Sequence, residues 1–144
     1  MADIGYTCDD GAVANMNSVT GKAATPIGAG YLRLYTSPTA GVSKATVIGS
    51  LVEASFTGYA AIALSSATWA AATVAAHVAG SQYTAQTFTC TGAGATQQIY
   101  GWAITDAGKT KLYVICPFAA GPYPITSAGD SVTVTPGLSD QSLN

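Results

Sequence analysis

Two segments in the last third of the chain alternate apolar and polar residues, which is the period of a half-buried β-strand. They cover residues 99–105 and 111–118 and are separated by the turn Asp106-Ala107-Gly108. Gly108 is expected to take a positive φ, as tight hairpin turns often require. The two segments therefore predict an antiparallel hairpin with one apolar face on each strand. Those faces carry Tyr100, Trp102 and Ile104 on the first strand and Leu112, Val114, Cys116 and Phe118 on the second.

Other segments are short, rich in Thr, β-branched or aromatic residues, and bounded by Gly or Pro, which is typical of strands. A short helix over residues 47–54 is an alternative for one of them, because Val47, Leu51 and Ala54 also fit a helical period. The expected strands are residues 31–36, 46–48, 51–56, 59–64, 82–91 and 131–135, with a strand or irregular chain at 68–78.

This pattern predicts an all-β fold, an antiparallel β-sandwich with jelly-roll-like connections. An immunoglobulin domain is disfavoured because Trp102 follows Cys90 by only twelve positions, which does not match the immunoglobulin Cys, Trp and Cys pattern.

The first thirty residues show no sustained period and are broken repeatedly by Gly, Asn and Asp. We therefore divide the chain into an irregular or extended N-terminal arm, residues 1–30, and a β-sandwich domain, residues 31–144. Apolar side chains in such an arm need the surface of the sandwich or of a neighbouring molecule. They form the candidate anchoring interface, which comprises Ile4, Tyr6, Val13, Met16 and Ile27.

Charge is scarce in this chain. Charged residues make up 8% of it, whereas a typical soluble domain carries about 25%. A surface with so little charge has a weak electrostatic defence against association, so we expect copies of the chain or a partner to cover much of it. The five basic residues are scattered and the net charge is −2, which argues against nucleic-acid binding.

No segment predicts a membrane span or a secretory signal. The longest apolar stretch, residues 60–80, is mostly alanine and contains Ser, Thr and His, so it is a poor transmembrane helix. The first five residues lack a basic start and an apolar run, so synthesis in the cytoplasm is expected.

Residues that commonly carry catalysis are few. His77 is the single histidine and Glu53 the single glutamate, so any triad or two-carboxylate site would need distant partners. We interpret His77 as a structural or interface residue. Asp9 and Asp10 lack the alternating oxygen ligands of a calcium loop and are interpreted as turn residues. The sequence thus predicts a protein that is not an enzyme and has no catalytic, cofactor-binding or metal site.

Three cysteines cannot all pair within one chain, and their spacing does not match a metal site. We expect Cys8, Cys90 and Cys116 to be buried thiols, since free cysteine behaves as a small apolar residue. A bridge between Cys90 and Cys116 is the alternative in an oxidising compartment.

Three segments, residues 98–106, 111–114 and 124–136, resemble small virion proteins encoded in the structural gene clusters of tailed bacteriophages. Residues 56–59, followed by Trp69, add to this resemblance, which covers residues 31–138. It rests on a β-sandwich pattern and not on a catalytic motif.

The resemblance implies a capsid decoration or cement protein, located on the virion surface, that bridges capsomers by binding alone and uses no cofactor. Its implied partners are the major capsid protein and further copies of the same chain, as a homo-oligomer with a trimer favoured over a dimer. A head-fibre protein, a tail component or a carbohydrate-binding β-sandwich module is the alternative, with Trp69 as the candidate exposed contact to a sugar.

Overall fold

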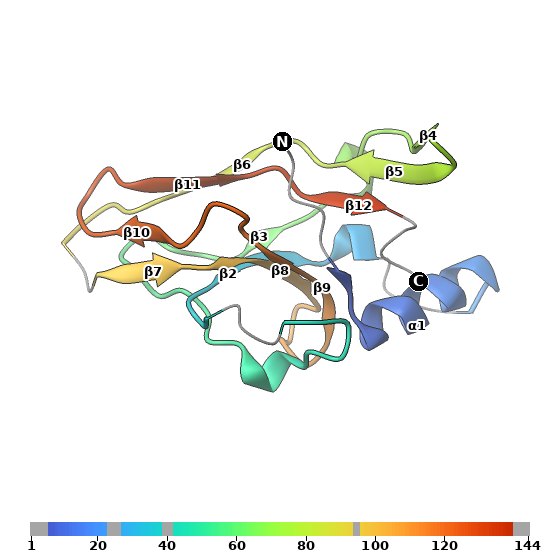
Figure 1. Ribbon diagram of the computed structural model, residues 1–144, viewed down its shortest axis with the longest axis horizontal. Coiled ribbons are helices and arrows are strands. Elements are labelled where there is room, and N and C mark those ends of the chain that lie inside the picture. Colours follow the sequence, from blue (N-terminus) through green and yellow to red (C-terminus); the bar gives the residue numbers. More distant parts are fainter. Residues whose placement is uncertain (1–5, 23–26, 39–41, 94–95, 140–144) are drawn as a thin grey trace.

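The computed structural model describes residues 6–22, 27–38, 42–93 and 96–139 (Figure 1). Within these ranges the chain forms twelve β-strands, one α-helix and three 3₁₀ helices. The helices are α1 (Asp9–Val19), η1 (Ile27–Ala29), η2 (Ile48–Ser50) and η3 (Ser66–Thr68). The strands are β1 (Tyr6–Thr7), β2 (Tyr31–Tyr35), β3 (Ile62–Ala63), β4 (Thr73–Ala75), β5 (Val78–Gln82), β6 (Gln86–Thr89), β7 (Gln97–Ile99), β8 (Gly101–Thr105), β9 (Leu112–Pro117), β10 (Tyr123–Ile125), β11 (Ser131–Val134) and β12 (Gly137–Ser139).

All pairings between these strands are antiparallel, which confirms the predicted all-β fold. The largest sheet has the strand order β1-β9-β8-β2-β3 and runs through the middle of the molecule (Figure 1). At its centre β8 and β9 form the hairpin that the alternating pattern predicts. The register places Leu34 opposite Trp102 and Trp102 opposite Cys116, so three buried side chains form a row across the sheet.

A second layer covers one face of this sheet. Figure 1 shows β6 and β11, followed by β5 and β12, passing above β2, β8 and β9. Phe88 of β6 and Val132 of β11 join Trp102 and Leu34 in the main hydrophobic core between the layers. The described strands of the second layer pair as β11-β6 and β12-β5-β4, and a further pair is β10-β7. The jelly-roll-like connection stays a prediction.

The opposite face of the central sheet is also buried. Tyr35, Ala103 and Ile115 form a second apolar cluster there, and Ile48 and Leu51 pack against it from the segment that follows β2. The central sheet is therefore apolar on both faces, which explains why every residue of β8 is buried.

The hairpin differs from the prediction in two details. Lys109 takes the positive φ, at 55°, in place of Gly108, because the carboxylate of Asp106 accepts hydrogen bonds from the backbone N–H groups of Thr110 and Lys111, both at 2.7 Å. These bonds fix the turn through the aspartate rather than through a glycine.

The alternation of faces is also interrupted. The register between β8 and β9 shifts between Ile104 and Thr105, and a β-bulge of this kind turns the following side chains to the other face. Leu112 consequently packs in the second cluster, whereas Val114 lies in the main core. Tyr100, which lies between β7 and β8, also packs against the second cluster and not beside Trp102.

The prediction of an irregular or extended arm over residues 1–30 is wrong for the part that the structure describes. β1 pairs with β9 at the edge of the central sheet, and α1 follows at once. Asp9 and Asp10 are helical residues and do not form a loop turn as predicted. They lie at the N-terminal end of α1, where the helix dipole stabilises negative charge. The apolar pattern did not predict this helix, because only two of its residues, Gly11 and Ala14, are buried. Two small residues give almost no apolar period.

Replacing Trp102 with alanine should lower the free energy of unfolding by about 3 to 5 kcal/mol, because the change leaves a large cavity in a close-packed core. The indole is 1% exposed. Chemical denaturation of the wild type and of Trp102→Ala measures the difference. Val52→Ala is the control, since Val52 is 62% exposed and should change stability by less than about 0.5 kcal/mol. Equal stability of wild type and Trp102→Ala would contradict the placement of Trp102 in the core.

Candidate functional site

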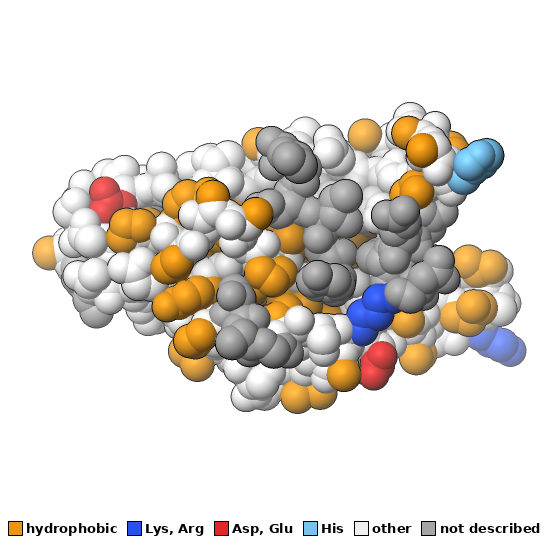
Figure 2. All heavy atoms as spheres, in the orientation of Figure 1, with side chains coloured by type: hydrophobic (Ala, Val, Ile, Leu, Met, Phe, Trp, Pro, Cys, Tyr) orange, Lys and Arg blue, Asp and Glu red, His pale blue; other side chains and the backbone are white. Residues whose placement is uncertain are grey.

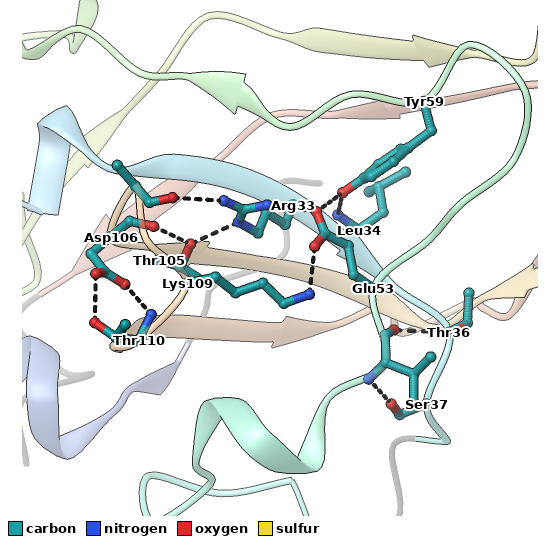
Figure 3. Close-up of polar contacts among 12 residues, drawn as sticks. Arg33, Leu34, Thr36, Ser37, Glu53, Tyr59, Thr105, Asp106, Lys109 and Thr110 are labelled. Atoms are coloured by element: carbon teal, nitrogen blue, oxygen red, sulfur yellow. Dashed lines mark hydrogen bonds and ion pairs between the residues drawn. The ribbon is translucent and has the colours of Figure 1, made fainter.

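A cluster of polar side chains surrounds Glu53 (Figure 3). Its Oε1 accepts hydrogen bonds from Nη1 of Arg33 at 2.7 Å and from the hydroxyl of Tyr59 at 2.9 Å. Its Oε2 accepts one from Nζ of Lys109 at 2.7 Å. The Arg33 guanidinium also donates to the hydroxyl of Thr105 at 2.9 Å. Glu53 therefore joins β2, the tip of the β8–β9 hairpin and the segment that leads to β3.

The segment around Glu53 is held beside β2 by backbone bonds. Ala54 N–H donates to the carbonyl of Leu34 at 2.9 Å, and Thr36 N–H donates to the carbonyl of Val52 at 2.7 Å. The hydroxyl of Ser37 accepts a further bond from Val52 N–H at 2.6 Å (Figure 3). These contacts aim the glutamate at Arg33, so the cluster follows from the pairing of the chain with β2.

The cluster is suited to structure and not to acid–base chemistry. Burial raises the pKa of Glu53, but the hydrogen bonds from Lys109, Arg33 and Tyr59 outweigh burial and hold the pKa below its ordinary value. A general acid at neutral pH needs a carboxyl whose pKa is raised instead. Burial also raises the pKa of Tyr59, so its hydroxyl stays protonated and remains a donor to the carboxylate. The cavity beside Arg33 and Glu53 is small, with a volume of about 10 Å³.

The other reactive side chains lie apart from this cluster. His77 is exposed in the turn between β4 and β5. Cys8, Cys90 and Cys116 are buried, as predicted, and burial together with Asp9 and Asp10 raises the pKa of the Cys8 thiol to about 12. Among the described residues no three His, Cys, Asp or Glu side chains are grouped as metal ligands would be.

The outer face of α1 carries large apolar side chains that touch solvent. Val13 is 61% exposed, Met16 63% and Val19 83%. Positions three apart lie on one side of a helix, so these residues form a continuous strip that we call the apolar ridge. Figure 2 shows hydrophobic side chains at the surface over α1. Large contiguous apolar patches on protein surfaces commonly mark interaction sites, so the ridge is a candidate contact surface.

The ridge faces outward because the opposite side of the helix is occupied by small residues. A side chain at Gly11 would collide with the carbonyl oxygen of Tyr113 on β9, so α1 lies closer to the sheet than larger residues would permit. Cys8 N–H donates to that same carbonyl at 2.8 Å, and Leu112 N–H donates to Oδ2 of Asp10 at 3.3 Å. The helix is thus fixed to β9 with its large apolar residues on the outside.

The structure separates the five residues of the candidate anchoring interface. Val13 and Met16 lie together on the ridge, whereas Ile27 is buried in the main core at 8% exposure. Tyr6 lies in β1, and Ile4 lies outside the described residues. Val19 was missed by the sequence analysis, although its spacing of three positions from Met16 and six from Val13 was the available signal.

Trp69, the candidate sugar contact, is part of the protein's own packing. Its Nε1 donates to the carbonyl of Gly28 at 3.0 Å, and its ring packs edge-on against Tyr83 with centroids 5.3 Å apart. The indole is therefore occupied on its polar edge and on one side.

In the described ranges no helix has the length and apolar character needed to span a membrane.

The depressed pKa of Glu53 predicts a pH dependence of stability. A carboxyl whose pKa is lower in the folded state stabilises the fold above its unfolded pKa, about 4.3, and this contribution is lost as the pH falls through the folded pKa. Glu53→Gln should lower the free energy of unfolding at pH 7 by about 1.5 to 3 kcal/mol, because Arg33 and Lys109 lose their anionic partner.

Urea denaturation of the wild type and of Glu53→Gln between pH 7 and pH 3 tests this prediction. The difference between the two proteins should be largest at neutral pH and should shrink below about pH 4.3. A difference that does not change with pH would show that the ionised carboxylate contributes nothing to stability.

Comparison of the chain with protein-family models, with curated proteins and with solved structures found no match to any of them.

Proposed function

We propose that this protein is a non-enzymatic structural component of a bacteriophage virion, a capsid decoration or cement protein that binds the major capsid protein through the apolar ridge of α1. The observation that carries the proposal is the inverted arrangement of this helix. Its small residues, Gly11 and Ala14, face the sheet, while Val13, Met16 and Val19 face solvent. A helix that served only the protein's own fold would bury its large apolar residues instead.

The polar chemistry of the chain supports a binding role. The single glutamate is engaged by Arg33, Lys109 and Tyr59, so these charges make contacts within the fold. The low charge of the whole chain, 8%, suits a surface that is covered in an assembly.

Each contact made by the ridge would be modest, and repetition would make it effective. Burying one Val or Met side chain stabilises a complex by about 1.5 to 3 kcal/mol. Because α1 is held against β9 before binding, little conformational entropy is lost when the ridge is covered. On a symmetric shell many such contacts act together, and linked sites raise the overall avidity by orders of magnitude. Capsomers bridged in this way would resist separation.

Met16→Lys should weaken binding to purified capsids that lack the protein. Losing the burial of one Met corresponds to a roughly 10- to 100-fold increase in Kd, measured by co-sedimentation of labelled protein with shells. The substitution is on an exposed position, so the melting temperature should stay unchanged.

Val52→Lys is the matched control, because Val52 is similarly exposed at 62% but belongs to the segment whose backbone bonds to Thr36, just after β2. Met16→Lys binding as tightly as Val52→Lys would exclude the ridge as the anchor, and a wild-type protein that never binds shells would exclude the capsid function. Deleting residues 1–22 is a poorer test, since it would remove β1 from β9.

A further inference from the structure

The strand β4 is an open sheet edge at one end of the molecule (Figure 1). It pairs only with β5 among the described strands, with Ala75 opposite Val78 and Val74 opposite Ala79. The two residues of the connecting turn, Ala76 and His77, have φ values of 49° and 65°, as in a type I′ hairpin turn.

This turn fixes the direction in which each backbone group of β4 points. In a two-residue hairpin the residues that flank the turn, here Ala75 and Val78, exchange both hydrogen bonds, and the next pair does not. The N–H and the C=O of Val74 therefore point away from β5, toward the open edge. Its side chain is 71% exposed, so a donor, an acceptor and an apolar side chain are presented by one residue.

The edge lacks most of the features that normally prevent strand addition. Natural edge strands are protected by charged side chains, by proline, by a bulge or by being very short, and of these only shortness applies to β4, which has three residues. Residues 54–105 contain no Asp, Glu, Lys or Arg, and Thr73, Val74 and Ala75 are all exposed. Beside this edge, one face of the sheet β12-β5-β4 forms an open groove of about 590 Å³, lined by small residues that include Ala71, Thr73 and Gly80.

We propose that β4 pairs antiparallel with β4 of a second copy of this chain, about a twofold axis at Val74. The occupant is a second copy because one residue supplies both the donor and the acceptor, and a twofold axis then satisfies both at once. A charged partner would gain no electrostatic attraction at an edge without charge, whereas two identical uncharged edges meet without electrostatic repulsion. The result is a six-stranded sheet that joins β12-β5-β4 of both copies.

This inference deepens the proposed function, on which its role in assembly rests, by naming the contact between copies as a twofold dimer and not a trimer. A dimer built in this way carries two apolar ridges, so a single unit could bind two capsomers. The ladder is short, and an interface well below about 1,200 Å² gives a weak complex. We therefore expect a dimer whose population rises with protein concentration.

Cysteine cross-linking at the axis tests the pairing directly. In a hydrogen-bonded antiparallel pair the two Cα atoms lie about 5.5 Å apart, which is within the range of a disulfide. Under mild oxidation Val74→Cys should form a covalent dimer, and Val47→Cys should not, although Val47 is similarly exposed at 65%. The native cysteines are buried and should not interfere. Absence of cross-linked Val74→Cys, or equal cross-linking of both variants, would overturn the proposal.

A second measurement uses sedimentation equilibrium of the unmodified protein and two variants. Val74→Lys places two like charges at the axis, and Val74→Pro removes the N–H without breaking a bond to β5. Each should raise the dimer Kd at least about tenfold, while Met16→Lys should leave it unchanged. A wild type that is monomeric at every concentration, or trimeric, would overturn the twofold pairing. A wild type that forms the dimer but never binds capsids would instead refute the proposed function and leave the dimer standing.

Discussion

The pairing of β8 with β2 on one side and β9 on the other is the interaction on which the rest of the structure depends. It aligns Leu34, Trp102 and Cys116 in one row of the main core and leaves Ala103 and Ile115 for the second cluster on the opposite face. With both faces apolar, the sheet must be covered twice. The second layer covers one face. The segment that carries Ile48, Leu51 and Glu53 covers the other face, and the ion pair of Glu53 with Arg33 holds this segment beside β2.

The alternating pattern of residues 99–118 predicted this centre correctly, because strand alternation and a short turn are local properties of the sequence. The bulge that redirects Leu112 and the turn fixed by Asp106 depend on the register between strands, which alternation alone does not determine. Helix α1 was not predicted, because its buried residues are Gly11, which lies against the carbonyl of Tyr113 on β9, and Ala14, and two small residues give almost no apolar period. Of the residues in the candidate anchoring interface, Val13 and Met16 lie on the ridge, whereas Ile27 packs into the main core.

Scarcity of charge connects the fold to its proposed assembly. Five of the charged side chains are used within the subunit: Glu53 with Arg33 and Lys109, and Asp106 and Asp130 as acceptors for backbone N–H groups in turns. The ridge and the β4 edge are left without charge, and hydrophobic and backbone contacts are what remain for recognition. They lie on different elements, so attachment to a shell and contact between copies can be altered independently.

Cryo-electron microscopy of phage capsids mixed with this protein tests the central proposal most directly. We expect added density at symmetry-related sites on the outer surface, with α1 against the major capsid protein and Val13, Met16 and Val19 covered. Shells that show no added density at saturating protein, or density in which α1 faces solvent, would contradict a decoration protein that anchors through this helix.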